Sequence, residues 1–306
     1  MDLSSQMVLF ARVVGAGSFS AAARDVGHSP SAISRQIGHL EDALGIRLLT
    51  RTSHGITTTE EGRQFFERCR IVANEVSEAE ALLDYLSERP AGRLNVVSTV
   101  AFGNVQLLPL LPRFLAENPE VSVSLRLTDD ALDLGSGEAD LAIQFSEQVT
   151  DDAVILRKLA LNRRVLVAAP DYLRQHGTPA ARADLAGHAC LKLTTVEHWN
   201  DWIPPGAAPG RPAFEANTAD AVYRASLAGL GIARLSTYLV NADIAAGRLA
   251  RVLPDYEQDD SNIVAIYRDR RNLSPKIRAF IDFLVDVYDP VPPWEREEMS
   301  DESVAV

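Results

Sequence analysis

Short polar side chains and one basic residue cluster near the start of a predicted helix between Ser29 and Gly45. They lie off the apolar face that Ile33, Ile37, Leu40 and Leu44 form at helical spacing. Hydroxyl, amide and guanidinium groups in this position are suited to hydrogen bonds with DNA phosphates and base edges. The candidate contacts on this helix are Ser31, Ser34, Arg35 and Gln36.

Two short helices joined by a tight turn would position these side chains. Ser18 is a natural N-cap for the first helix, and Gly27 can adopt the positive φ angle that ends it. Ser29 caps the second helix, and Pro30 occupies its first position, where the missing N–H is harmless. This arrangement is typical of a protein that inserts a helix into the major groove of DNA. A small helical domain with another role can contain the same two capped helices, so that alternative stays open.

A predicted β-hairpin follows between Leu48 and Thr59, with a turn that contains Gly55. A β wing beside a recognition helix can lay Arg51 and the neighbouring threonines along the DNA backbone or the minor groove. His28, His39 and His54 do not have the spacing of metal ligands and are interpreted as surface or turn residues.

Four segments carry a specific resemblance: Phe10–Ala23, Ser29–Gly45, Leu48–Thr52 and Thr58–Gly62. Together they resemble the N-terminal domain of LysR-type transcriptional regulators. The resemblance implies a winged helix-turn-helix that binds operator DNA as a dimer, followed by an effector-binding domain. His54 departs from the family pattern, which often has a basic residue at that position. The family's DNA-contacting positions correspond to Pro30, Ser31, Ser34, Arg35, Gln36, Arg51 and Thr52.

Charge is distributed unevenly along the chain. The 306 residues carry a formal net charge of −12, whereas residues 1–60 contain five basic and five acidic residues. A neutral domain with Arg35 and Arg51 on one face would bind DNA modestly per subunit. Assembly to a homodimer or homotetramer would then supply affinity by multiplying the contacts.

The sequence gives no signal for export or for a membrane span. It has no run of about 18 apolar residues, and its N-terminus lacks a basic region followed by an apolar run. Cys69 and Cys190 are far apart, so a disulfide framework is not expected and a reducing cytoplasm fits. A redox role for either cysteine stays open.

Residues 61–89 form a predicted linker helix with a heptad repeat of about three heptads. The strict alternation of four- and three-residue steps favours a coiled-coil seam between two chains. A helix that packs on its own domain is the alternative. The family resemblance likewise implies a linker helix that pairs between subunits. The predicted dimerisation residues are Phe65, Cys69, Val72, Val76, Ala79, Leu83 and Leu86.

Strands alternate with helices from residue 93 to residue 288, which predicts an α/β fold. Leu108–Phe114, Glu138–Ile143 and Gly229–Ala233 resemble the family's effector domain, which is similar to a type 2 periplasmic binding protein. The resemblance implies two α/β lobes that the chain crosses twice. The expected boundaries are lobe I at 93–161 and 263–288, lobe II at 162–262, and a disordered acidic tail at 289–306.

Ligands of such sheets bind beyond the carboxyl ends of the strands and at helix N-termini. The side chains expected there could bind a small organic acid, with Arg234 as the counter-charge. Each threonine could instead be a helix cap or a loop residue. Gln144 stands where an Arg is common in part of the family, which weakens the case for a carboxylate ligand. Trp199 and Trp202 would line the second lobe or form its core. The candidate effector contacts are Ser98, Thr99, Thr128, Gln144, Ser146, Thr194, Thr195, Thr218 and Arg234.

These features together predict a cytoplasmic, sequence-specific transcription regulator. The chain has no nucleotide-binding, nucleophile or metal motif, so no enzymatic activity, cofactor or metal is expected. The expected partners are double-stranded promoter DNA, a small-molecule effector, further copies of the chain and RNA polymerase, with no membrane. Residues 93–288 alone also resemble a solute-binding protein, but the N-terminal residues argue against that alternative.

Overall fold

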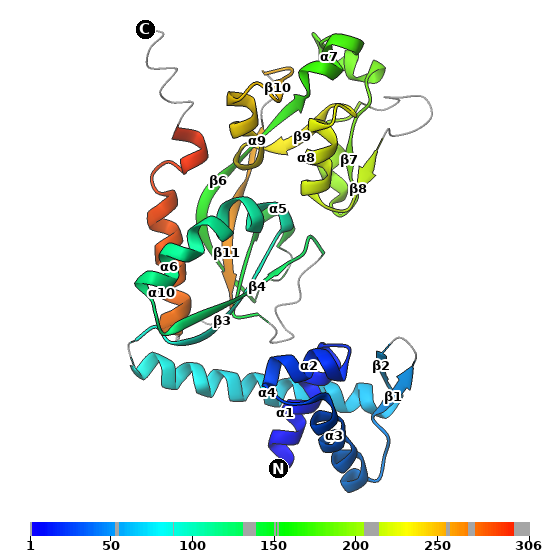
Figure 1. Cartoon of the computed structure of the whole chain (residues 1–306), viewed down its shortest axis with the longest axis vertical. Coiled ribbons are helices and arrows are strands. Elements are labelled where there is room, and N and C mark those ends of the chain that lie inside the picture. The colour runs from blue at the N-terminus through cyan, green and yellow to red at the C-terminus, as the bar shows by residue number, and fades with distance from the viewer. Residues whose placement is uncertain are drawn as a thin grey trace. The chain divides into compact units, whose positions relative to one another are not determined.

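The computed structural model describes residues 2–52, 55–87, 89–130, 139–149, 151, 153–204, 214–254, 258–268 and 273–296. The chain forms two compact units (Figure 1). The first unit consists mainly of residues 1–88, and the second unit begins at Arg89. Among the described helices, none combines the length and apolar character needed to cross a lipid bilayer.

The first unit begins with three helices, of which the second and third start at the predicted caps. They are α1 (Leu3–Gly15), α2 (Phe19–Val26) and α3 (Pro30–Leu44). The Ser18 hydroxyl accepts from the Ala21 amide and the Ser29 hydroxyl accepts from the Ala32 amide, each at 3.2 Å. Gly27 ends α2 with a φ of 66°, in the left-handed region. The predicted caps and the turn are therefore confirmed.

A two-stranded wing and a long helix complete the first unit. The antiparallel strands β1 (Leu49–Thr52) and β2 (Gly55–Thr58) precede α4 (Glu60–Ser87). Gly62 in α4 lies so close to the wing that an added Cβ would come within 1.9 Å of the Leu48 carbonyl oxygen. Glycine at this position therefore allows α4 to pack against the strand entrance.

The first half of α4 packs on its own unit, which corrects part of the predicted dimer seam. Cys69 is fully buried in one apolar core with Phe10 and Val13. The Phe65 ring lies 5.6 Å from the Phe10 ring. Cys69 therefore has no surface left for a second chain, and Phe65 is half-buried against α1. The periodicity could not reveal this because α1 offers the same kind of apolar partner as a second chain would.

The remaining predicted seam residues lie farther along α4. Val72 is half-buried, and Val76 and Ala79 are exposed. The side chains of Leu83 and Leu86 lie outside the described residues. Ile71 is also exposed, although the heptad pattern did not select it. An interchain role of α4 beyond Val72 stays a prediction.

The second unit is built on a mixed seven-stranded sheet in the order β10-β6-β11-β5-β3-β4, with β9 also paired to β6. The parallel strands are β3 (Gly92–Ser98), β4 (Val121–Leu127) and β5 (Leu141–Phe145). The antiparallel strand β11 (Gln258–Tyr267) joins β5 to β6 (Ile155–Ala168). This arrangement gives the predicted α/β class with two lobes.

The long strand β6 belongs to both lobes. Residues 155–164 pair with β11 in the first lobe. From Arg164 onward β6 pairs with β9 (Ala233–Ser236) and β10 (Ala250–Arg251) in the second lobe. The chain thus enters the second lobe along β6 and returns along β11. The expected lobe boundaries at residues 162 and 262 stay a prediction.

The helical layer of the first lobe starts earlier than the sequence indicated. The sequence predicts a helix from Leu107 to Ala116. In the structure these residues are part of a helical run that begins with α5 (Val100–Phe102) and ends with α6 (Leu111–Glu117). Between them lie a π-helical turn (Gly103–Leu107) and a 3-10 turn (Leu108–Leu110). Prolines inside a helix remove backbone donors, which accounts for the irregular turns around Pro109 and Pro112.

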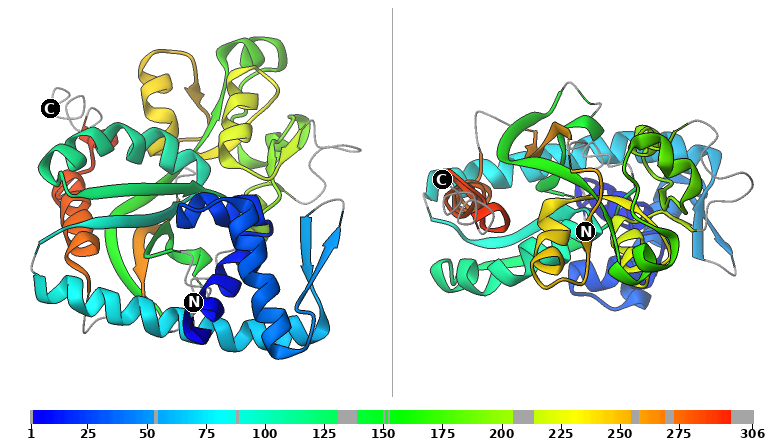
Figure 2. Two further views of the ribbon diagram at one scale, coloured as in Figure 1. Left: turned by 60° about the horizontal axis from the view of Figure 1, so that its bottom comes forward. Right: turned by 90° about the horizontal axis from the view of Figure 1, so that it is seen from above.

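Aromatic rings join α6 to α10 (Pro275–Tyr288) beside the sheet. The Phe114 ring contacts the Phe280 ring at 4.8 Å and the Phe283 ring at 5.4 Å. Figure 2 shows α10, in orange to red, next to the green α6. These buried rings anchor the C-terminal helix to the first lobe.

The second lobe surrounds the far end of β6. Its helices are α7 (Pro170–His176), α8 (Ala219–Leu227) and α9 (Thr237–Ala245), and its short strands include β7 (Lys192–Leu193) and β8 (Glu215–Ala216). Its core contains Tyr172, Cys190 and Trp202. Of the two possibilities for Trp202, the structure therefore supports a core residue.

Residues 289–296 are ordered, which corrects the predicted start of the disordered tail. The Trp294 ring lies 5.2 Å from the Tyr288 ring, and its carbonyl accepts from Asn241 Nδ2 at 2.8 Å. Glu295 is buried, accepts from the Thr237 hydroxyl and pairs with Arg163. Within the segment whose prolines and acidic residues suggested disorder, Trp294 and Glu295 therefore have specific partners. Residues 297–306 lie outside the described residues.

Candidate nucleic-acid interface and effector cleft

The first two turns of α3 present Ser31 and Arg35 on one face. Both are exposed and one helical turn apart, and Arg35 Nε donates to the Ser31 carbonyl at 3.4 Å. The Ser31 and Ser29 hydroxyls lie 3.1 Å apart. Pro30 is exposed at the start of the same turn. This part of α3 therefore offers a guanidinium, hydroxyls and an open backbone end to a ligand.

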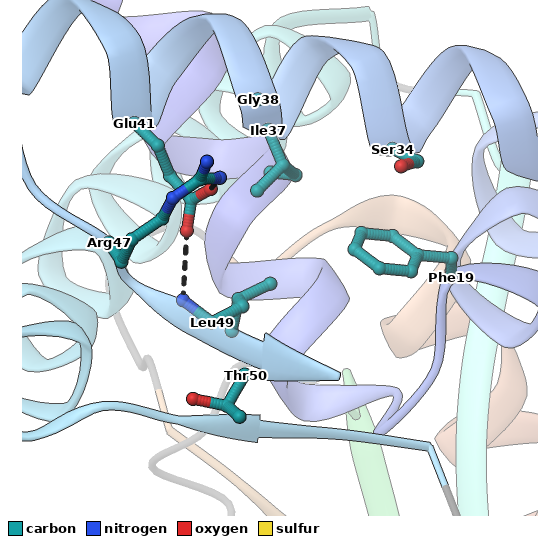
Figure 3. A pocket seen from close by; sticks show the side chains of 8 residues that line it. All are labelled: Phe19, Ser34, Ile37, Gly38, Glu41, Arg47, Leu49 and Thr50. Carbon is teal, nitrogen blue, oxygen red and sulfur yellow. Dashed lines mark hydrogen bonds and ion pairs between the residues drawn. The ribbon is translucent and has the colours of Figure 1, made fainter. Parts of the chain in front are cut away.

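The other two predicted contacts on α3 are placed differently. One residue step turns a helix by about 100°, so Gln36 points away from the face of Arg35. Gln36 is half-buried, and its side-chain oxygen is buried without a hydrogen-bond partner. Ser34 is half-buried and lies opposite the Phe19 ring (Figure 3). His39 and Asp42, which were not selected from the sequence, are exposed on the face of Ser31 and Arg35.

The wing places Arg51 and Thr52 near its tip. In the register of β1 and β2, Arg51 is opposite Ile56 and Thr52 is opposite Gly55. The side chains of Arg51 and Thr52, and all of His54, lie outside the described residues. Their proposed contacts to DNA therefore stay predictions from the sequence.

A buried carboxylate links α3 to the wing. Glu41 Oε1 accepts from the Leu48 amide at 2.7 Å and the Leu49 amide at 3.0 Å, and Glu41 Oε2 accepts from Arg47 Nη1 at 2.8 Å. Burial by itself would raise the pKa of Glu41, but these donors outweigh it and hold the pKa below its ordinary value. Glu41 thus fixes where β1 starts relative to the recognition helix.

In the sequence, Glu41 is recognisable only as one of the five acidic residues of residues 1–60. The signal available was its place inside the Leu40–Gly45 segment of the family resemblance, immediately after an apolar position. Glu41 also lines a cavity of about 350 Å³ between α2, α3 and β1 (Figure 3). Gly38 and Thr50 line the same cavity.

Several predicted effector contacts are occupied by local hydrogen bonds in the second unit. The Thr218 hydroxyl caps α8 by accepting from the Ala221 amide at 3.2 Å. The Ser146 hydroxyl accepts from the Asn262 amide, and the Thr194 hydroxyl donates to the Ala216 carbonyl. The Thr128 hydroxyl is bonded to Asp130. For the three threonines these bonds fit the cap or loop alternative, and the effector role of all four residues stays a prediction.

Other predicted contacts are buried. Ser98, Thr99, Gln144 and Arg234 are each less than a tenth exposed. Arg234 lies in β9, and its carbonyl accepts from Trp199 Nε1 at 3.3 Å. The Ser98 and Thr99 hydroxyls make no hydrogen bond of good geometry. Thr195 is half-buried after β7.

A polar cluster at the lobe junction includes residues that the sequence analysis missed. The Tyr238 hydroxyl lies beside Thr99 and Ser236 and is influenced electrostatically by Asp129 and Arg164. Tyr238 is buried, and this burial raises the pKa of its hydroxyl. Ser236 is opposite Arg164 in the pairing of β9 with β6. We refer to Thr99, Asp129, Arg164, Ser236 and Tyr238 as the junction cluster.

Arg164 is fixed in this cluster by several partners. It forms an ion pair with Glu147 and donates to the Ser261 hydroxyl at 3.1 Å. Its guanidinium lies 4.5 Å from the Trp199 ring centre and 5.8 Å from that of Phe145. Both rings therefore add a cation–π attraction to the ion pair.

Asp129 connects the two lobes. Its Oδ1 accepts from the Val100 amide at 2.9 Å, and its Oδ2 accepts from the Ala219 amide at 3.3 Å. Val100 begins α5 in the first lobe, whereas Ala219 begins α8 in the second lobe. Burial raises the pKa of Asp129 despite these two bonds, and the nearby Asp130 and Asp220 raise it further.

The described cysteines and acidic residues offer no sign of redox or metal chemistry. Cys69 and Cys190 are both buried as free thiols. Burial raises the pKa of Cys69 to about 12 and that of Cys190 to about 11, which disfavours the reactive thiolate. Within the described ranges, no group of three or more His, Cys, Asp and Glu residues could hold a metal ion.

The geometry defines a class of protein: a winged helix-turn-helix DNA-binding unit followed by a two-lobed α/β unit. Residues 4–63 match the family model for the bacterial regulatory helix-turn-helix protein, lysR family. Residues 87–289 match the model for the LysR substrate binding domain. The chain therefore belongs to the LysR family and is a DNA-binding transcriptional regulator.

Individual relatives agree with this assignment over nearly the whole chain. The HTH-type transcriptional regulator CrgA from Neisseria meningitidis is 34% identical over 288 residues, which cover 92% of this chain and 96% of CrgA. The solved structure of CrgA superposes with a TM-score of 0.60 at 32% identity, covering 94% of this chain and 100% of CrgA. Full-length AphB, a virulence activator from Vibrio cholerae, gives a TM-score of 0.63 at 26% identity, covering 94% and 99% of the two chains. Such relatives are named as transcriptional regulators and not as enzymes.

Proposed function

We propose that this regulator binds a promoter operator through α3 and the wing, and that a small-molecule effector between the lobes modulates operator binding or promoter activation. The observation that carries the proposal is the exposed face of the first two turns of α3. It combines Ser31 and Arg35 on one face of a helix whose start is fixed by Ser29 and Pro30. Side chains at the start of a recognition helix reach base edges in the major groove.

The proposed DNA contacts are divided between reading and positioning. Arg35 can donate to a guanine edge, and Ser31 and Ser34 can donate to phosphates or bases. Arg51 and Thr52 at the wing would contact the adjacent backbone or minor groove. Gln36 is the weakest of the proposed contacts because its side-chain oxygen is buried. Pro30 would approach the backbone at the start of the helix.

Assembly would supply the affinity that a neutral domain lacks. Two or four copies would place several recognition helices on half-sites of one operator, which multiplies modest individual affinities. The exposed Val76 and Ala79 on α4 are the described candidates for this pairing. The proposed setting is the cytoplasm, where promoter DNA and RNA polymerase, the further proposed partner, are present.

The junction cluster is the proposed effector site. Its Asp129 accepts backbone N–H groups from both lobes, its hydroxyls are buried beside one another, and the neighbouring Ser98 hydroxyl is buried without a hydrogen-bond partner. Buried polar groups without partners are costly, and a ligand that supplies partners would be stabilised there. An effector that binds one lobe arrangement better than another would shift the population of that arrangement. From the sequence alone, the predicted effector is a small organic acid.

DNase footprinting on the promoter region upstream of the protein's own gene tests the DNA-binding part of the proposal. We expect protection of an interrupted palindrome that fades steeply as the salt concentration rises. Protection that does not depend on sequence would contradict the proposal.

The substitution Arg35→Ala tests the recognition helix directly. We expect specific operator binding to weaken by about 1–3 kcal/mol, because one bidentate contact to a base is lost. Arg174→Ala is a matched control, since Arg174 is an exposed arginine of the second unit paired only at the surface with Asp171. Equal operator affinity of Arg35→Ala and the control in a titration would remove Arg35 from the interface.

A further inference from the structure

Asp129 occupies a position that a ligand carboxylate would otherwise take. Its two oxygens accept one backbone N–H from each lobe, at Val100 and at Ala219. The amide of Ala219 opens α8, a helix of nine residues, and such amides favour negative charge. The Thr218 hydroxyl accepts from another amide of the same turn, that of Ala221. The anion position between the lobes is therefore filled by the chain itself.

The charges around this position disfavour a second carboxylate. Asp130 and Asp220 already act on Asp129 by like-charge repulsion. The buried cation of the junction cluster, Arg164, is paired with Glu147 and held against the Trp199 ring. A carboxylate ligand would add negative charge beside these groups in a partly desolvated site, which is unfavourable.

The same place offers unused hydrogen-bonding capacity to an uncharged ligand. Ser98, Thr99 and Ser236 are each at most 5% exposed. The Ser98 hydroxyl has no hydrogen-bond partner, and the Thr99 and Ser236 hydroxyls interact only with the hydroxyl of Tyr238 among the described contacts. Hydroxyls can donate or accept, so they can serve a hydroxyl or amino group of a ligand equally well.

We propose that Asp129 determines the charge class of the effector: it fills the anion position between the lobes, so that the cleft accepts a neutral or amine-bearing polar molecule and rejects a small carboxylic acid. The inference rests on the proposed effector role of the cleft. It differs from the small organic acid predicted from the sequence, which relied on hydroxyls beyond the strand ends and on Arg234 as counter-charge and did not include Asp129.

Removal of the internal carboxylate should create a site for an external one. In the full-length chain, Asp129→Ala leaves the Val100 and Ala219 amides without their acceptor. We expect sodium acetate to raise the melting temperature of Asp129→Ala in a saturable manner, relative to sodium chloride at equal ionic strength. Acetamide, which is neutral and of the same shape, should have no comparable effect.

Wild-type protein and Asp130→Ala are the matched controls. Asp130 is exposed next to Asp129 and bonds only to Thr128 among the described contacts, so its removal changes charge without opening the anion position. Half-saturation by acetate should occur at a concentration at least about tenfold lower in Asp129→Ala than in either control, corresponding to about 1.4 kcal/mol. Equal acetate binding by the wild type, or no saturable response of Asp129→Ala, would overturn the proposal.

The footprint of the wild-type protein separates this inference from the proposed function. A negative acetate result with an intact operator footprint overturns the charge assignment alone, whereas loss of the footprint concerns the DNA-binding role. If Asp129→Ala does not fold, Asp129→Asn keeps the shape but offers only one acceptor oxygen. Hydrogen exchange should then be at least about tenfold faster at the Val100 or Ala219 amide than in Asp130→Asn. Unchanged exchange at both amides would overturn the proposal.

Discussion

Glu41 in the first unit and Asp129 in the second both accept hydrogen bonds from two backbone amides. Their surroundings differ in charge. Arg47 adds a guanidinium to Glu41, whereas Asp130 and Asp220 add negative charge near Asp129. The pKa of Glu41 is consequently lowered and that of Asp129 is raised. The surroundings thus favour the charged carboxylate of Glu41 in the first unit and disfavour that of Asp129 in the second.

The difference between the two carboxylates matches the parts of the molecule that each one joins. Glu41 holds the wing to the recognition helix within one domain, where a fixed geometry favours DNA recognition because contacts need correct register. Asp129 joins two lobes at a site where a ligand is proposed to shift an equilibrium. A contact that is only marginally favourable can be broken or remade by a ligand of modest differential affinity.

The largest effect should come from Glu41→Ala. It leaves the buried Leu48 and Leu49 amides without an acceptor, so the first unit should lose roughly 3 kcal/mol of stability. Glu41→Gln is the sharper comparison, because both amides bond to one oxygen, Oε1, which a glutamine can supply. Chemical denaturation of the full chain, followed by a probe in each unit, measures both variants. An equal loss for Gln and Ala would show that charge and not the acceptor oxygen dominates.

The two carboxylates should also respond to pH in opposite directions. Glu41 has a lowered pKa, so its contribution is present above its unfolded pKa, near 4, and is lost as pH falls through the folded value. Asp129 has a raised pKa, so its contribution is present below its unfolded pKa and is lost as pH rises through the folded value.

Thermal unfolding of the wild type, Glu41→Gln and Asp129→Asn between about pH 4 and pH 7 checks this prediction. Relative to wild type, Glu41→Gln should lose less stability on acidification. Asp129→Asn should gain less stability on acidification, because the amide cannot take up the proton. Parallel pH profiles for the two variants would remove the contrast between the two sites.

Local signals in the sequence predicted the ends of α2 and α3, because Ser18, Gly27, Ser29 and Pro30 act on their immediate neighbours. The position of Asp129 could not be predicted in this way. Its partners, Val100 and Ala219, are brought together only when β4 and α8 meet across the lobes. The rule that ligands bind beyond strand ends selected Thr128, the residue directly before Asp129. Asp129 was not selected because hydroxyls, and not a carboxylate, were expected to bind the ligand. The heptad repeat in α4 predicted an interchain contact for Cys69, which is buried in its own unit. The spacing of apolar residues does not identify the surface against which they pack.

Removal of matched helix caps compares the two units at a smaller scale. Ser29→Ala at α3 and Thr218→Ala at α8 each remove one cap hydrogen bond of 3.2 Å, and each should cost about 1 kcal/mol. Ser29→Ala should weaken operator binding because the first turn of α3 carries the proposed contacts. Thr218→Ala should leave operator binding of the effector-free protein unchanged. Equal operator affinities for the two variants, measured by titration, would show that the cap of α3 does not contribute to operator recognition.

The smallest effect should be a gain in stability from Gly38→Ala. Gly38 lies in the middle of α3, and an added Cβ would meet no atom within 4 Å. Alanine is favoured over glycine in a helix interior, so the first unit should become more stable by up to about 1 kcal/mol. Gly231→Ala in the second unit is the contrasting control, because its Cβ would lie 2.2 Å from the Ala189 carbonyl oxygen and should destabilise. If Gly38→Ala stabilises the protein but weakens operator binding, the open space beside Gly38 is used by DNA. If it stabilises the protein and leaves operator binding unchanged, the approach of DNA is limited to the first two turns, where Ser31 and Arg35 lie.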